Sequence, residues 1–114
     1  MDRLVIQLGS DEPERVAAAL TVGMTAVAAG AVVHLWLSGP ASLLAVPGRE
    51  PAYDLAHAPA LASALDSMDS VTVCSQCAAR RGLDLADLRP GAVIAGATTL
   101  VEALLTDGTQ ALTY

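Results

Sequence analysis

The chain of 114 residues carries 6 basic and 12 acidic side chains, and its formal net charge of −6 argues against nucleic-acid partners and an anionic membrane surface, since both require clustered basic residues. Hydrophobic residues make up 54% of the chain, which is enough for one domain over residues 1–114 whose core needs neither metal nor disulfides. The most apolar region, residues 16–37, is interrupted by glycine, threonine and histidine, so we expect a buried helix and strand there and no membrane span.

Short apolar runs alternate with helical patterns along the whole chain. In chain order we expect a strand at 3–8, a helix that ends near 29, a strand at 31–37, a helical turn at 41–46, a helix at 59–68, a strand at 71–74, a helix at 75–81, a turn or short helix at 83–88, a strand at 92–95, a helix at 98–106 and a strand at 110–113. The strand runs are almost continuously apolar, which is typical of parallel strands buried on both faces. We therefore predict an α/β fold with three layers, α/β/α, and a five-stranded, mainly parallel sheet of Rossmann-like character.

The first helix has sequence signals at both of its ends. Ser10 or Asp11 is expected to cap its first turn. Pro13 suits that turn because its missing N–H costs nothing there, and Glu14 meets the positive end of the helix dipole. Gly30 is expected to end the helix.

The N-terminal stretch MDRLVIQLGS lacks the charged segment and long apolar run of a signal peptide. We therefore expect a cytoplasmic, reducing location. In that compartment a C-x-x-C pair is more often catalytic, redox-active or metal-binding than a structural disulfide.

The stretch VTVCSQCAARRG, residues 71–82, holds the only two cysteines of the chain, Cys74 and Cys77. Reactive groups gather at the carboxyl ends of parallel strands, and Cys74 is predicted to end the third strand and to begin a helix. The helix dipole and free N–H groups would favour a thiolate at Cys74, and Arg80 or Arg81 could add positive potential. Cys77 follows one helical turn later, where it could take part in disulfide exchange or resolve a persulfide.

Other interpretations of the two cysteines stay open from the residues alone. Free cysteine packs as a small hydrophobe, so Cys77, and less readily Cys74, could be a core residue. A structural zinc site needs four ligands, and His34 and His57 are the only added nitrogen candidates, so we expect no metal and no other cofactor within one chain. A thioredoxin-type oxidoreductase is disfavoured because the pair follows the third strand and encloses Ser-Gln. Phosphate binding is not expected, since no glycine-rich phosphate motif follows the first strand.

Most of the chain resembles a known family, and its C-terminal half resembles it most specifically. The segments VTVCSQCAARRGL and DLRPGAVIAGATTLVEALLTDGTQALTY are similar to DsrE/DsrF-like proteins, which include sulfur-relay subunits of tRNA thiolation and of dissimilatory sulfur oxidation. The resemblance extends from the opening strand with its acidic helix start to the terminal Leu112-Thr113-Tyr114. It implies a compact α/β/α domain that forms a homotrimer or homohexamer and that meets sulfur-donor and sulfur-acceptor proteins.

The resemblance also implies a role for one cysteine. In relay members, a cysteine at the position matching Cys74 carries sulfur as a persulfide and passes it to a partner. Cys77 has no counterpart in the relay subunits, whereas small stand-alone relatives often have C-G-x-C; here Ser75 stands in place of that glycine. We therefore interpret the chain as a stand-alone sulfur carrier that could act as a sulfurtransferase, with Cys77 as a candidate resolving thiol.

A non-catalytic function is the alternative to sulfur transfer. The chain is rich in alanine, valine and leucine, which leaves apolar helix faces to bury between protomers. Such assemblies are usually closed and symmetric. The alternative is therefore an oligomeric protein that binds a small ligand or serves in assembly, and buried, unreactive cysteines would favour it.

Overall fold

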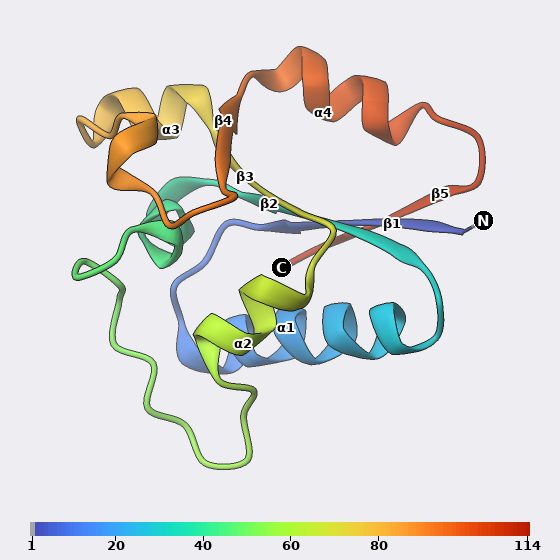
Figure 1. Cartoon of the computed structure of the whole chain (residues 1–114), viewed down its shortest axis with the longest axis horizontal. Coiled ribbons are helices and arrows are strands. Elements are labelled where there is room, and N and C mark those ends of the chain that lie inside the picture. Colours follow the sequence, from blue (N-terminus) through green and yellow to red (C-terminus); the bar gives the residue numbers. More distant parts are fainter. Residues whose placement is uncertain (1) are drawn as a thin grey trace.

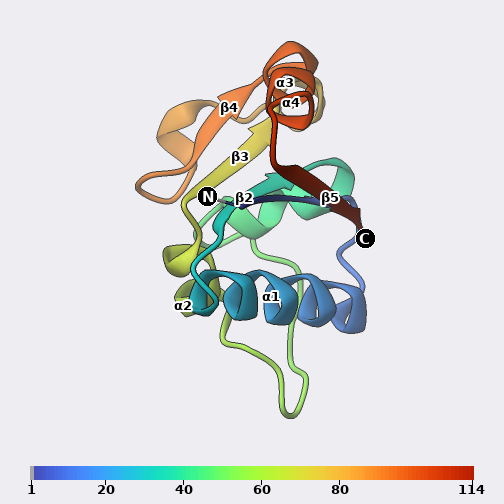
Figure 2. The same cartoon turned by 90° about the vertical axis from the view of Figure 1, so that its right-hand side faces the viewer.

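The computed structural model describes residues 2–114, which form one sheet of five parallel strands in the order β4-β3-β2-β1-β5. The strands are β1 (Arg3–Leu8), β2 (Val32–Leu37), β3 (Ser70–Cys74), β4 (Val93–Ala95) and β5 (Thr109–Thr113). The helices are α1 (Pro13–Ala28), α2 (Leu61–Ser67), α3 (Ser75–Arg80) and α4 (Ala97–Leu104), with two 3₁₀ helices, η1 (Gly39–Ala45) and η2 (Leu85–Asp87). Figures 1 and 2 show α1 and α2 on one side of the sheet and α4 on the other. The predicted α/β fold with a parallel five-stranded sheet is confirmed.

The start of α1 differs from the prediction. Glu12 caps this helix, because its carboxylate accepts the N–H groups of Glu14 at 3.1 Å and Arg15 at 3.0 Å. Ser10 instead accepts the N–H of Glu12 at 3.0 Å. Pro13 explains the difference: its fixed φ suits the first helical position, which makes the residue directly before it the cap. Gly30 follows the helix in the left-handed region, with φ +92°, as expected at a helix end.

The main core lies between the sheet and α1. One strand face and the facing side of α1 are fully buried, and the side chains that form this layer include Ile6, Leu8, Val16, Ala19, Leu20, Val33, Leu35 and Val73. Gly23 lets α1 approach closely, because a Cβ atom there would lie 2.5 Å from Met68 Cε and 3.2 Å from Ile6 Cδ1. The small residues Ala19 and Gly23, both buried, therefore meet a packing requirement of this layer.

The opposite face of the sheet is covered less completely. No residue of α4 is buried, and β5, an edge strand, is exposed at most of its positions. Within residues 2–114, none of the helices is both long and apolar enough to cross a membrane. The two sides of the sheet thus differ: one is a closed core and the other keeps apolar surface in contact with solvent.

Candidate functional site

The carboxyl ends of the strands bring together segments that are far apart in the sequence. Leu37 of β2 pairs with Val73 of β3, and Cys74 pairs with Ala95 of β4. Because the strands are parallel, Gly39, which follows β2, lies at the same end of the strands as Cys74. Open parallel sheets hold their ligands and reactive groups at this carboxyl end.

Both cysteines lie at this carboxyl end of the strands as free thiols. Cys74 is the last residue of β3 and the N-cap of α3, and its side chain is half-buried. Cys77 lies one turn into α3 and is only 7% exposed. Cys77 is the third residue of the helix that Cys74 caps, so the two thiols lie one helical turn apart.

A backbone N–H and an arginine both lie close to the sulfur of Cys77. The backbone N–H of Gly39 donates to Cys77 Sγ at 3.1 Å. Gly39 is the first residue of η1, so its N–H has no acceptor inside that helix and is free to bind the sulfur. Arg80 Nη1 lies 4.0 Å from the same sulfur, and Arg81 Nη1 donates to the Cys77 carbonyl at 3.1 Å.

These contacts decide the protonation of Cys77. Burial by itself raises the pKa of this thiol. The hydrogen bond from Gly39, the contact with the Cys74 side chain and the charges of Arg80 and Arg81 act in the opposite direction and outweigh burial. The pKa of Cys77 is therefore lower than that of an ordinary thiol, and a larger share of it is thiolate near neutral pH.

The sequence alone directed attention to Cys74 as the thiolate, through the dipole of the helix that follows it. In the structure Cys74 is the N-cap of α3, which has 6 residues, and its role as a thiolate stays a prediction. The donor that binds a sulfur is Gly39, which is 38 residues away from Cys77 in the chain. The sequence marks Gly39 only as a turn residue after the second strand, and no local pattern indicates that its N–H meets a cysteine.

The two histidines do not join the cysteines. His34, on β2, shares a hydrogen bond of 2.7 Å with Ser70 Oγ, at the start of β3. His57 lies exposed in the loop before α2, in the left-handed region with φ 59°. Among residues 2–114, no three histidine, cysteine or acidic side chains come together in a way that could hold a metal ion.

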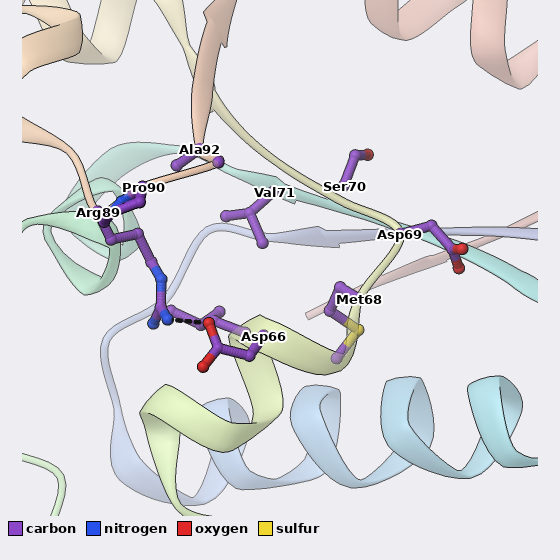
Figure 3. A pocket seen from close by; sticks show the side chains of 10 residues that line it. Asp66, Met68, Asp69, Ser70, Val71, Arg89, Pro90 and Ala92 are labelled. Carbon is purple, nitrogen blue, oxygen red and sulfur yellow. Dashed lines mark hydrogen bonds and ion pairs between the residues drawn. The ribbon is translucent and has the colours of Figure 1, made fainter.

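A cavity of about 190 Å³ lies at the other end of β3, beside the connection from α2 (Figure 3). Arg89 forms an ion pair with Asp66 in this cavity. Close by, Asp69 Oδ2 accepts the N–H of Val33 at 2.7 Å. Because these charged groups already have partners within the fold, we assign them a structural role that joins α2 to the sheet.

An α/β protein with two neighbouring thiols at its strand ends is the class that the fold and the site define. The family model described as the DsrE/DsrF-like family matches residues 3–114, and the chain belongs to this family. Proteins of this family function in sulfur relay and are often oligomeric. The fold is shared with the ychN protein of E. coli, with a TM-score of 0.81, 19% identity and full coverage of both chains.

A second solved structure gives the same result. MTH1491 from Methanobacterium thermoautotrophicum, a protein of unknown function, matches with a TM-score of 0.77, 16% identity and full coverage of both chains. At these identities the likeness concerns the fold alone. Among curated proteins, no sequence match to this chain was found.

Proposed function

We propose that the protein is a sulfur carrier in which Cys74 accepts sulfane sulfur as a persulfide and passes it on. The main support is the presence of two free thiols at the carboxyl end of β3, of which Cys74 is the more exposed. Membership of the DsrE/DsrF-like family also supports a role in sulfur relay. The resemblance to relay members also implies the carrier role for Cys74, which ends β3.

The proposed transfer is a balanced exchange of sulfur between thiols. The thiolate of Cys74 attacks the outer sulfur of a persulfide donor, R–S–SH, and the S–S bond of the donor breaks. The products are the persulfide Cys74–S–SH and the thiolate R–S⁻. Delivery is the same exchange with an acceptor thiolate, which takes the outer sulfur while Cys74 leaves as a thiolate. Neither step requires an external oxidant or reductant.

Two variants with a single thiol each test this proposal. Cys77→Ser keeps Cys74, and Cys74→Ser keeps Cys77. Each protein is incubated anaerobically with inorganic polysulfide and its intact mass is measured. We expect Cys77→Ser to gain the mass of one sulfur atom and Cys74→Ser to gain none, and Ser75→Ala serves as a control that keeps both thiols. A failure of Cys77→Ser to gain sulfur contradicts the proposal, and a gain on Cys74→Ser contradicts the assignment to Cys74.

Assembly between protomers is a second candidate function, and a separate observation supports it. Val101 on α4 and Leu105, the C-cap of this helix, lie four residues apart and are 48% and 78% exposed. Residues at this spacing share one helix face, and exposed apolar surface of this kind often marks a protein interface. We propose that this α4 face joins copies of the chain into a homotrimer or homohexamer, with or without sulfur chemistry at Cys74.

Light scattering tests the assembly. The unaltered protein is expected to have a mass several times that of one chain at micromolar concentration. Leu105→Lys places a charge in the proposed interface and is expected to lower that mass while the far-ultraviolet circular dichroism stays the same. Leu85→Lys is the matched control, because Leu85 is a similarly exposed leucine, at 60%, on η2. A monomer in the unaltered protein would exclude this candidate.

A further inference from the structure

The contacts that favour a thiolate converge on Cys77, which is the cysteine that a simple carrier does not need. Gly39 donates its N–H to Cys77 Sγ at 3.1 Å, and Arg80 Nη1 lies 4.0 Å from that atom. Sulfur is a weak acceptor as a neutral thiol, whereas a thiolate is stabilised by N–H donors and cations. Two such groups around a sulfur that is only 7% exposed indicate that the fold is built to hold an anion there.

Arg80 is available for this role. Its side chain is exposed, and within residues 2–114 the structure gives it no carboxylate partner, in contrast to Arg89. Gly39 adopts a left-handed φ of +53°, and a Cβ atom there would lie 3.3 Å from the carbonyl oxygen of Gly9. The glycine therefore allows the tight turn after β2 that brings its N–H to Cys77.

On the basis of the proposed function, we infer that the protein is also a persulfide reductase, in which Cys77, held by Gly39 and Arg80, attacks the Cys74 persulfide and releases the sulfur as hydrosulfide. Cys74 and Cys77 are then the catalytic residues, and Gly39 and Arg80 are positioning residues. The lowered pKa of Cys77 agrees with this role, because only a thiolate attacks a sulfur–sulfur bond efficiently.

The atoms and electrons of this step balance. The thiolate of Cys77 attacks the inner sulfur of Cys74–S–SH, and a Cys74–Cys77 disulfide bond forms. The bond between the inner and outer sulfur breaks, and the outer sulfur leaves with the electron pair and its proton as HS⁻. Cys77 is oxidised and the outer sulfur is reduced to sulfide. A cellular dithiol, as external reductant, then restores both thiols by thiol–disulfide exchange.

The release step requires attack on the inner sulfur. The Cys74 sulfur, which becomes the inner sulfur once the persulfide forms, lies one helical turn before Cys77, because Cys74 is the N-cap of α3 and Cys77 is its third residue. Attack on the outer sulfur would only transfer the sulfur to Cys77. The substrate of this site is thus a persulfide or polysulfide, and the product that it releases is hydrosulfide.

The experiment follows hydrosulfide and protein mass together after anaerobic loading with inorganic polysulfide and removal of the excess. The unaltered protein is expected to release one hydrosulfide per chain and to become lighter than the reduced protein by two hydrogen atoms. Cys77→Ser is expected to keep its added sulfur and release little hydrosulfide. Arg80→Gln is expected to release it several-fold more slowly at neutral pH, with the rate recovering as the pH is raised. Arg3→Gln, at the amino end of β1 and so at the opposite end of the strands, is expected to behave like the unaltered protein.

The outcomes separate this inference from the proposed function. A sulfur adduct that persists equally in the unaltered protein and in Cys77→Ser overturns the reductase step and leaves the carrier intact. The absence of any adduct in Cys77→Ser overturns the carrier and the reductase together. If Cys77→Ser does not fold, Arg80→Gln decides alone: a release rate equal to that of Arg3→Gln at every pH overturns the role of Arg80 and Cys77.

Discussion

The two ends of β3 differ in how their polar groups are used. At the amino end, Asp69 accepts the backbone N–H of Val33, and Arg89 is paired with Asp66 (Figure 3). The charges of Arg89 and Asp66 neutralise one another, and the Asp69 carboxylate is held by a backbone N–H of β2.

At the carboxyl end, the N–H of Gly39 and the charge of Arg80 both act on the sulfur of Cys77. Among residues 2–114, no carboxylate appears among the groups that shift the protonation of this thiol. The polar groups at the amino end of the strand therefore bind partners within the fold, whereas positive groups act on a sulfur at the carboxyl end. A reactive thiolate requires nearby groups that stabilise its negative charge.

The largest effect is expected at the amino end of β3. Asp69→Ala removes the acceptor of the Val33 N–H, which is buried, and should lower the free energy of unfolding by about 1–3 kcal/mol. Asp69→Asn keeps an acceptor oxygen and should cost less. Urea denaturation measures both. Asp66→Ala is a control for loss of charge alone: this side chain is 69% exposed, so its ion pair should contribute less than about 1 kcal/mol. A loss as small for Asp69→Ala as for Asp66→Ala would remove the contrast between the two ends.

A smaller, pH-dependent effect on the free energy of unfolding is expected at the carboxyl end of β3. Burial raises the pKa of Cys77, but Gly39, Cys74, Arg80 and Arg81 together lower it by more than burial raises it. The pKa of Cys77 in the folded chain therefore lies below that in the unfolded chain. Between these two pKa values the unfolded chain binds more protons than the folded chain. Stability from the thiolate is therefore fully present above the unfolded pKa and is lost as the pH falls through the folded pKa.

Urea denaturation at a series of pH values tests this sign. The difference in unfolding free energy between the unaltered protein and Cys77→Ser should grow as the pH rises from mildly acidic to the ordinary range of a free thiol. Asp69→Asn should show no such trend against the unaltered protein in that range, because it leaves Cys77 and the groups around it unchanged. A Cys77→Ser difference that stays constant with pH would mean that the positive groups around Cys77 do not hold a thiolate.

Local patterns predicted the elements well and their ends less well. The apolar runs located all five strands, because a parallel strand buried on both faces has no polar alternation. The N-cap of α1 was wrong, since Ser10 and Asp11 are common caps but Pro13 fixes the first helical position and so makes Glu12 the cap. The spacing of Cys74 and Cys77 and the turn at Gly39 were visible as separate signals. Their contact was not, because it joins the ends of two strands.

The sequence by itself determined the order of strands and helices, the family, and the place of two thiols at the end of β3. These follow from apolar periodicity and from a motif within a few residues, which are local properties. Only the tertiary structure decided which of the two sulfurs meets the positive groups. Parallel pairing of β2 with β3 brings the Gly39 N–H to Cys77 across 38 residues of chain, and that long-range contact has no signature in local sequence.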